Sequence, residues 1–192
     1  MGNSEFDEQW LARLQAVGKV QERYVWLLFL SCLFYGSLDS SVESIEVPIV
    51  GLELLASTVR ASGPAVISFI VLTFTGALRA SGTATRELGL KRVDCRAEKL
   101  DLHPNSIDLA FYTSKRSARW LAAVTHFKYP VFFSLALFVA LWVLLQSYQG
   151  ASVRGSVLAG LGGLLWLLAI IQVGQVWISR FRTVATVVSG DA

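Results

Sequence analysis

The residues best suited to hold a metal ion lie near the middle of the chain, at Cys95, Asp101 and His103. Thiolate and imidazole groups are typical zinc ligands, and a structural zinc site normally uses four of them. The alternation of residues 99–103 is typical of a short strand, which would place Asp101 and His103 on one side. Because the stretch offers one His and one Cys and no repeated ligand pair, we expect an exposed loop and keep a metal site as an alternative.

A second set of reactive groups is the pair of carboxylates at Glu46 and Glu53, which flank a short apolar run. Two carboxylates can bind a cation or act together as acid and base. No His, Cys or Ser nucleophile accompanies them, so we expect them to face water. Pro48 and Gly51 argue against a continuous helix here. We therefore expect an ordered, non-helical segment on the membrane surface or dipping into it.

Two amide side chains, Gln172 and Gln175, stand within an otherwise apolar stretch close to the C-terminus. Amides inside hydrocarbon need hydrogen-bond partners, so they bond to another helix or line a wet cavity. They are accordingly our candidates for a polar bundle contact or a pore.

Motifs of the common catalytic families are absent from the sequence. It has no phosphate-binding glycine loop, no HExxH, no paired CxxC and no GxSxG. No local arrangement places a nucleophile beside a base. We therefore predict no catalytic residue and no cofactor, although distant residues could still converge in an intramembrane enzyme.

The composition of the chain indicates an integral membrane protein. Apolar residues make up 54% and charged residues only 16% of the 192 residues, whereas soluble domains average about 25% charged residues. A spanning helix needs roughly 20 predominantly apolar residues, and its backbone must be satisfied internally. Four stretches without Asp, Glu, Lys or Arg, extended where needed by their neighbours, predict four transmembrane helices: Tyr24–Leu38, Pro64–Leu78, Tyr129–Gln146 and Gly155–Ser179.

Charge placement predicts how these helices are oriented. Every Lys and Arg except Arg60 and Arg154 falls in the N-terminal segment, the central segment or the tail. Basic loops stay in the cytoplasm, so we expect both termini inside and the acidic loop outside. The composition is compatible with a bacterial inner membrane.

The predicted fold class is therefore all-α, a polytopic membrane protein with four spans and two amphipathic interfacial helices. Residues 1–23 form a cytoplasmic amphipathic helix on the inner leaflet, and the second interfacial helix precedes the third span. The remaining division is a first hairpin at 24–80 with an acidic extracytoplasmic loop at 39–63, a basic cytoplasmic segment at 81–128, a second hairpin at 129–179 and a cytoplasmic tail at 180–192.

The helix predicted just before the third span is basic on one face and apolar on another. Its basic residues adjoin a span, which favours anionic lipid headgroups over nucleic acid as their partner. The residues expected to contact headgroups at the cytoplasmic face are Lys115, Arg116, Arg119 and Lys128.

Small residues recur every fourth position in the second and fourth spans. This spacing lets helix backbones approach closely within a membrane. The predicted helix-packing residues are Gly76, Ala80, Gly155, Ala159, Gly160 and Gly163, and the second span is expected to continue inward as a helix.

The sequence thus favours a non-enzymatic membrane protein that acts by helix association, as an assembly subunit, an anchor or a membrane effector. Its partners would be the bilayer and other membrane helices, including a second copy, and not nucleic acid. One alternative is a small channel or transporter that uses the Gln172/Gln175 face and the outer carboxylates. A second alternative is an intramembrane or metal-dependent enzyme.

Overall fold

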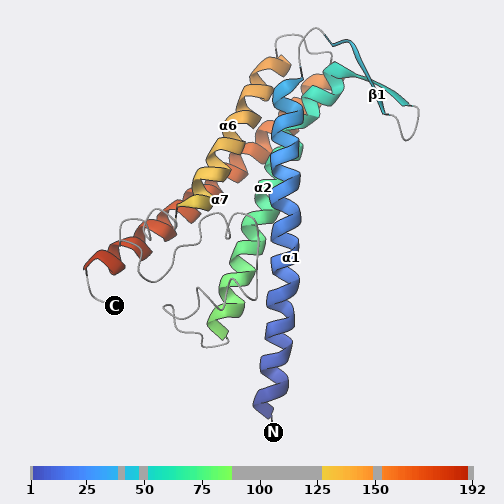
Figure 1. Ribbon diagram of the computed structural model, residues 1–192. Helices are drawn as coiled ribbons and strands as arrows, with labels where there is room; N and C mark the ends of the chain where they lie inside the picture. Colours follow the sequence, from blue (N-terminus) through green and yellow to red (C-terminus); the bar gives the residue numbers. More distant parts are fainter. Residues whose placement is uncertain (1, 39–41, 48–51, 88–126, 149–152, 190–192) are drawn as a thin grey trace.

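The computed structural model is a bundle of long helices with a short β-hairpin at one end (Figure 1). The structure describes residues 2–38, 42–47, 52–87, 127–148 and 153–189. The elements within these ranges are α1 (Gly2–Ser37), β1 (Ser44–Val47), β2 (Leu52–Leu55), α2 (Ala56–Glu87), α6 (Lys128–Tyr148) and α7 (Val153–Ser189).

Three of these helices are long and apolar enough to cross a membrane: Ala56–Ala80, Lys128–Tyr148 and Gly155–Phe181. They contain the second, third and fourth predicted spans. The first predicted span is not among them, because its apolar stretch in α1 ends at the polar residues Gly36 and Ser37 and is preceded by Glu22 and Arg23. Helix α2 also continues beyond the predicted span to Glu87, as its sequence indicated.

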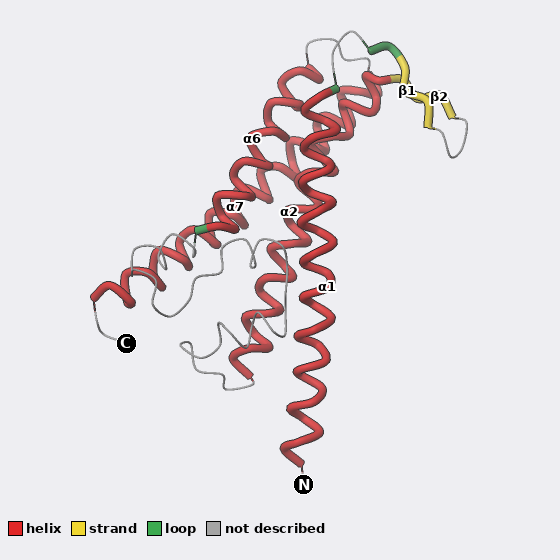
Figure 2. Tube along the Cα trace, in the orientation of Figure 1, coloured by secondary structure: helices red, strands yellow, loops and turns green. Residues whose placement is uncertain are grey.

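The predicted surface helix and the predicted first span form one element in the structure. Helix α1 runs without interruption from Gly2 to Ser37 (Figure 2). A helix lying on the inner leaflet would have to turn sharply before entering the membrane. Sharp turns in helices are usually caused by proline, glycine–serine pairs or inserted groups, and no proline precedes position 48. The second predicted interfacial helix lies outside the described residues.

The all-α prediction does not hold in the loop between the first two long helices. Strands β1 and β2 pair in antiparallel fashion, with Glu46 opposite Glu53 and Ile45 opposite Leu54. The backbone N–H of Ala56 donates a hydrogen bond to the carbonyl of Glu43 at 3.0 Å, which closes the hairpin onto the start of α2. The expectation of an ordered, non-helical segment is confirmed, and its form is a hairpin.

Helix α2 is the centre of the bundle and packs against α1, α6 and α7. Half of the residues in its apolar window are buried, compared with 22% for α7. Rings from two helices form part of the core: Phe74 of α2 meets Tyr129 and Phe133 of α6 edge-on, at centroid distances of 5.7 and 5.1 Å. Helix α1 contributes Leu28, which is fully buried.

The long helices alternate in direction along the bundle. The start of α1 and the ends of α2 and α7 point away from the β-hairpin, as does the start of α6 (Figure 1). The bundle therefore has a hairpin end and an opposite end, and the opposite end carries most of the features described next.

Candidate functional site

Helix α7 approaches α2 closely at Gly162. A Cβ atom at this position would lie 3.0 Å from Cβ of Pro64 and 3.2 Å from the backbone nitrogen of Ala65. Only hydrogen fits there without displacement of a neighbour. A second tight site is Gly63, where a Cβ atom would lie 2.7 Å from Cδ1 of Tyr35 in α1. Two glycines thus set how closely α2 approaches its neighbours.

The small residues predicted to pack fall on different faces of the bundle. Gly155 and Ala159 are buried. Gly163 is half-buried, and its Cβ position lies 3.8 Å from Leu144 of α6. Gly160 and Gly76 are exposed, with no atom within 4 Å of their Cβ positions, and Ala80 is also exposed.

Gly162 and Gly63 were not among the predicted helix-packing residues. Their signal was present as the doublet Gly162–Gly163 and the pair Gly63–Pro64. The buried positions of α7 include 155, 159, 162, 169 and 173, which mix spacings of three and four. Because a helix has 3.6 residues per turn, one face combines spacings of three and four. A strict four-residue spacing therefore does not identify these positions.

Polar contacts join three helices near the end opposite the hairpin. The guanidinium of Arg79 in α2 donates a hydrogen bond to the amide oxygen of Gln175 in α7 at 2.5 Å. The buried amide of Gln21 in α1 donates to the carbonyl of Ala77 in α2 at 3.4 Å. These contacts lie within a few residues of each other on α2 and mark one level of the bundle.

In the structure Gln175 has a hydrogen-bond partner on another helix, Arg79 of α2. Gln175 is exposed and Gln172 is half-buried. Neither side chain lines the groove described below. The pore interpretation of these two residues therefore gains no support from their positions.

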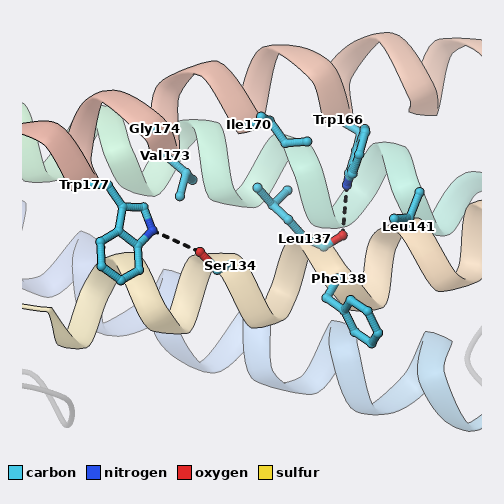
Figure 3. A pocket seen from close by; sticks show the side chains of 9 residues that line it. All are labelled: Ser134, Leu137, Phe138, Leu141, Trp166, Ile170, Val173, Gly174 and Trp177. Carbon is cyan, nitrogen blue, oxygen red and sulfur yellow. Dashed lines mark hydrogen bonds between the residues drawn. The ribbon is translucent and has the colours of Figure 1, made fainter.

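An open groove of about 340 Å³ runs between α6 and α7 (Figure 3). Figure 3 shows both tryptophans of α7 pointing toward α6. The indole N–H of Trp166 donates to the carbonyl of Leu137 at 2.8 Å, and that of Trp177 donates to Oγ of Ser134 at 3.1 Å. The groove is lined by Ser134, Leu137, Phe138, Leu141, Trp166, Ile170, Val173, Gly174 and Trp177.

Aromatic rings gather where the groove meets the end opposite the hairpin. Trp177 stacks on Phe127 and on Phe181, with centroid distances of 5.4 and 5.6 Å. Lys128 follows Phe127 at the start of α6, and its Nζ atom lies 5.1 Å from the centre of the Tyr129 ring. Indole and phenol rings favour the interface between hydrocarbon and water, so this cluster fits the level of the lipid headgroups.

Several predicted site residues lie outside the described residues. These are the metal candidates Cys95, Asp101 and His103 and the headgroup candidates Lys115, Arg116 and Arg119. Within the described ranges no group of three or more His, Cys, Asp or Glu side chains is close enough to hold a metal.

Comparison of the chain with protein-family models, with curated proteins and with solved structures finds no match.

Proposed function

We propose that this protein is an integral membrane protein with four spans, α1 included, which works by associating with other membrane helices. Support for α1 as a span, in addition to the other three helices, comes from its second half. Large apolar side chains are exposed there around much of the helix, where only lipid or another helix would shield them from water: Trp26, Leu27, Phe29, Leu30, Leu33 and Phe34. Opposite them, Val25 and Leu28 are buried in the bundle, so this half of α1 belongs to the same apolar layer as the other helices.

Our proposal places both termini in the cytoplasm of a bacterial cell, with the protein in the inner membrane. Support comes from the distribution of basic residues, which the positive-inside tendency assigns to the cytoplasm. The alternating directions of α1, α2, α6 and α7 agree with two membrane hairpins joined on that side.

The observation that carries the association hypothesis is the open space at Gly160. This glycine lies on the exposed face of α7, and no atom lies within 4 Å of its Cβ position. The same face continues through Leu164, Leu167 and Ile171, all exposed. Lipid tails are as apolar as these side chains, so association in a bilayer depends on close packing at small residues. The buried face of α7 already serves α2, and the Gly160 face remains for a partner helix, from a second copy or from another subunit of an assembly.

Replacement of Gly160 by Leu tests this function. A leucine there would hold a partner backbone away and forfeit many dispersion contacts of about 0.1–0.2 kcal/mol each. The expected result is loss of crosslinked oligomers in native membranes, or loss of co-purifying membrane subunits, with the monomer still folded.

The matched control is Leu161→Ile, on the same helix and about 100° around its axis from Gly160, where an exposed side chain is already present. It should leave association unchanged. If Gly160→Leu associates as well as the unmodified protein, the face has no partner and the proposal fails.

A further inference from the structure

The groove between α6 and α7 presents an apolar surface despite the polar atoms in its walls. Both indole N–H groups already donate hydrogen bonds, to Leu137 and to Ser134. The Ser134 hydroxyl also donates to the carbonyl of Pro130 at 2.8 Å. With these polar atoms satisfied, the groove offers an occupant mainly dispersion contacts, and a polar solute would lose its own hydration without replacement.

The shape of the groove suits a flexible chain and not a helix. Its volume of about 340 Å³ lies at the small end of ligand sites, which span about 300–1,000 Å³. A helix with its side chains is about 10–12 Å across. The rim residue Phe138 is 66% exposed and Ile170 is 39% exposed, so the groove opens toward the lipid side along its length. Most of its lining residues are large, with Gly174 and Ser134 as the small ones, whereas helix contacts in membranes favour runs of small residues.

Positive charge lies at one end of this groove. Lys128 follows Phe127, which stacks on the groove residue Trp177. Arg180 comes one helical turn after Trp177 and is half-buried. Basic residues beside a membrane surface attract anionic headgroups. An apolar groove with aromatic rings at one end, and with two basic residues close to those rings in the sequence, matches an anionic lipid in both of its parts.

We propose that the groove binds one acyl chain of an anionic phospholipid, whose headgroup lies beside Lys128 and Arg180. The chain would lie along Leu137, Leu141 and Ile170, and the headgroup would sit at the level of the Phe127–Trp177–Phe181 cluster. This inference needs the protein to lie in a membrane, but it does not need the association proposed for the Gly160 face.

Gly174 provides the sharpest test, because it lines the groove and no atom lies within 4 Å of its Cβ position. Gly174→Leu would extend into the groove from a position where the Cβ atom itself has open space. The matched control is Gly76→Leu on α2, where the Cβ position is equally open and lies outside the groove. If Gly174→Leu fails to fold, Leu141→Trp narrows the groove from the α6 side.

The full chain is reconstituted in vesicles that contain phosphatidylglycerol with a photoreactive diazirine on one acyl chain. Labelled sites are mapped by mass spectrometry. In the unmodified protein, labels should concentrate on groove residues relative to the exposed face of α1 at Leu30 and Leu33. Gly174→Leu should lose this enrichment, and Gly76→Leu should keep it.

The headgroup is tested with the double variant Lys128→Gln and Arg180→Gln and with a phosphatidylcholine probe carrying the same diazirine chain. Groove enrichment should be greater for phosphatidylglycerol, and the double variant should remove that preference. Equal enrichment with both lipids would overturn the anionic assignment. Labelling spread evenly over all lipid-facing residues, or crosslinks between two copies through the groove, would overturn the lipid site itself. Oligomer formation measured on the same samples separates this outcome from failure of the association hypothesis.

Discussion

At the scale of single residues, Ser68 places a polar hydroxyl in the apolar interior of the bundle. Its side chain is fully buried in α2, and its hydroxyl has no hydrogen-bond partner in the structure. Thr75, two turns later on the same helix, is also buried, but its hydroxyl donates to the carbonyl of Leu72 at 2.8 Å. A buried polar group without a partner costs about 1–3 kcal/mol.

Ser68→Ala should therefore raise the free energy of unfolding, because it removes an unpaired hydroxyl and few packing atoms. Thermal unfolding in detergent should show a higher Tm than for the unmodified protein. Thr75→Ala is the comparison and should lower the Tm, since it removes a satisfied group and a buried methyl. A lower Tm for Ser68→Ala would mean that the hydroxyl has a role in the folded protein.

Gly162→Ala should destabilise the bundle although alanine favours helices. The added Cβ would press on Pro64 and on the backbone of α2. Overpacking costs about 1–3 kcal/mol, which exceeds or offsets the gain of about 1 kcal/mol from replacing glycine in a helix. Gly160→Ala, two residues away and in open space, should keep that gain. The Tm values in detergent should thus fall for Gly162→Ala and hold or rise for Gly160→Ala, and the reverse order would contradict the packing.

At the scale of elements, the register of the β-hairpin places two acidic residues directly opposite each other. Glu46 and Glu53 are direct cross-strand partners, and the neighbouring pair Ile45 and Leu54 is apolar. Like charges directly opposite each other destabilise an antiparallel pair. A two-stranded hairpin is only marginally stable by itself, so this pair has a large influence on whether the strands form.

Glu46→Lys should stabilise the hairpin by about 0.2–1 kcal/mol, because it converts a repulsive cross-strand pair into an attractive one. Slower amide hydrogen exchange of residues 44–47 and 52–55 would report the change. Glu43→Lys adds the same charge just before β1 and should have a smaller effect. Faster exchange in Glu46→Lys would show that the two carboxylates share a favourable partner.

At the scale of the whole molecule, the distribution of charge and the direction of the helices agree. By their places in the elements, Glu43, Glu46 and Arg60 lie at the hairpin end, and Arg79, Lys128 and Arg180 lie toward the opposite end. In a bilayer this asymmetry would place the opposite end toward the cytoplasm. The proposed four spans would also place α1 across the bilayer beside α2, α6 and α7.

Cysteine labelling in intact cells decides the number of spans. In a background without Cys32 and Cys95, an impermeant thiol reagent should modify cysteines at Ser41 and Gln149. It should spare cysteines at Ala16 and Ser106. Modification at Ala16 together with Ser41 would show that α1 does not cross the membrane. Modification at Ser106 alone would show that the topology is the reverse of the proposed one.

Much of this architecture follows from composition along the chain. The helices at Ala56–Ala80, Lys128–Tyr148 and Gly155–Phe181 were predictable because long apolar runs without charge have few alternatives to a spanning helix. The hairpin was only half predictable. Pro48 and Gly51 indicated a break in helix, but strand pairing depends on a register between two segments that no local pattern specifies.

The sequence by itself determined which segments are apolar, where the charges lie and where small residues recur. Only the tertiary structure decided which small residue meets a neighbour: Gly162 lies against Pro64, whereas Gly160 remains open. The same is true of the groove. Trp166 and Trp177 hydrogen-bond to α6, but in the largely apolar sequence of α7 no pattern distinguishes them from residues that face lipid. The physical reason is that periodicity fixes a face only relative to its own helix axis, while the rotation and crossing of each helix depend on how all the side chains of the bundle pack together.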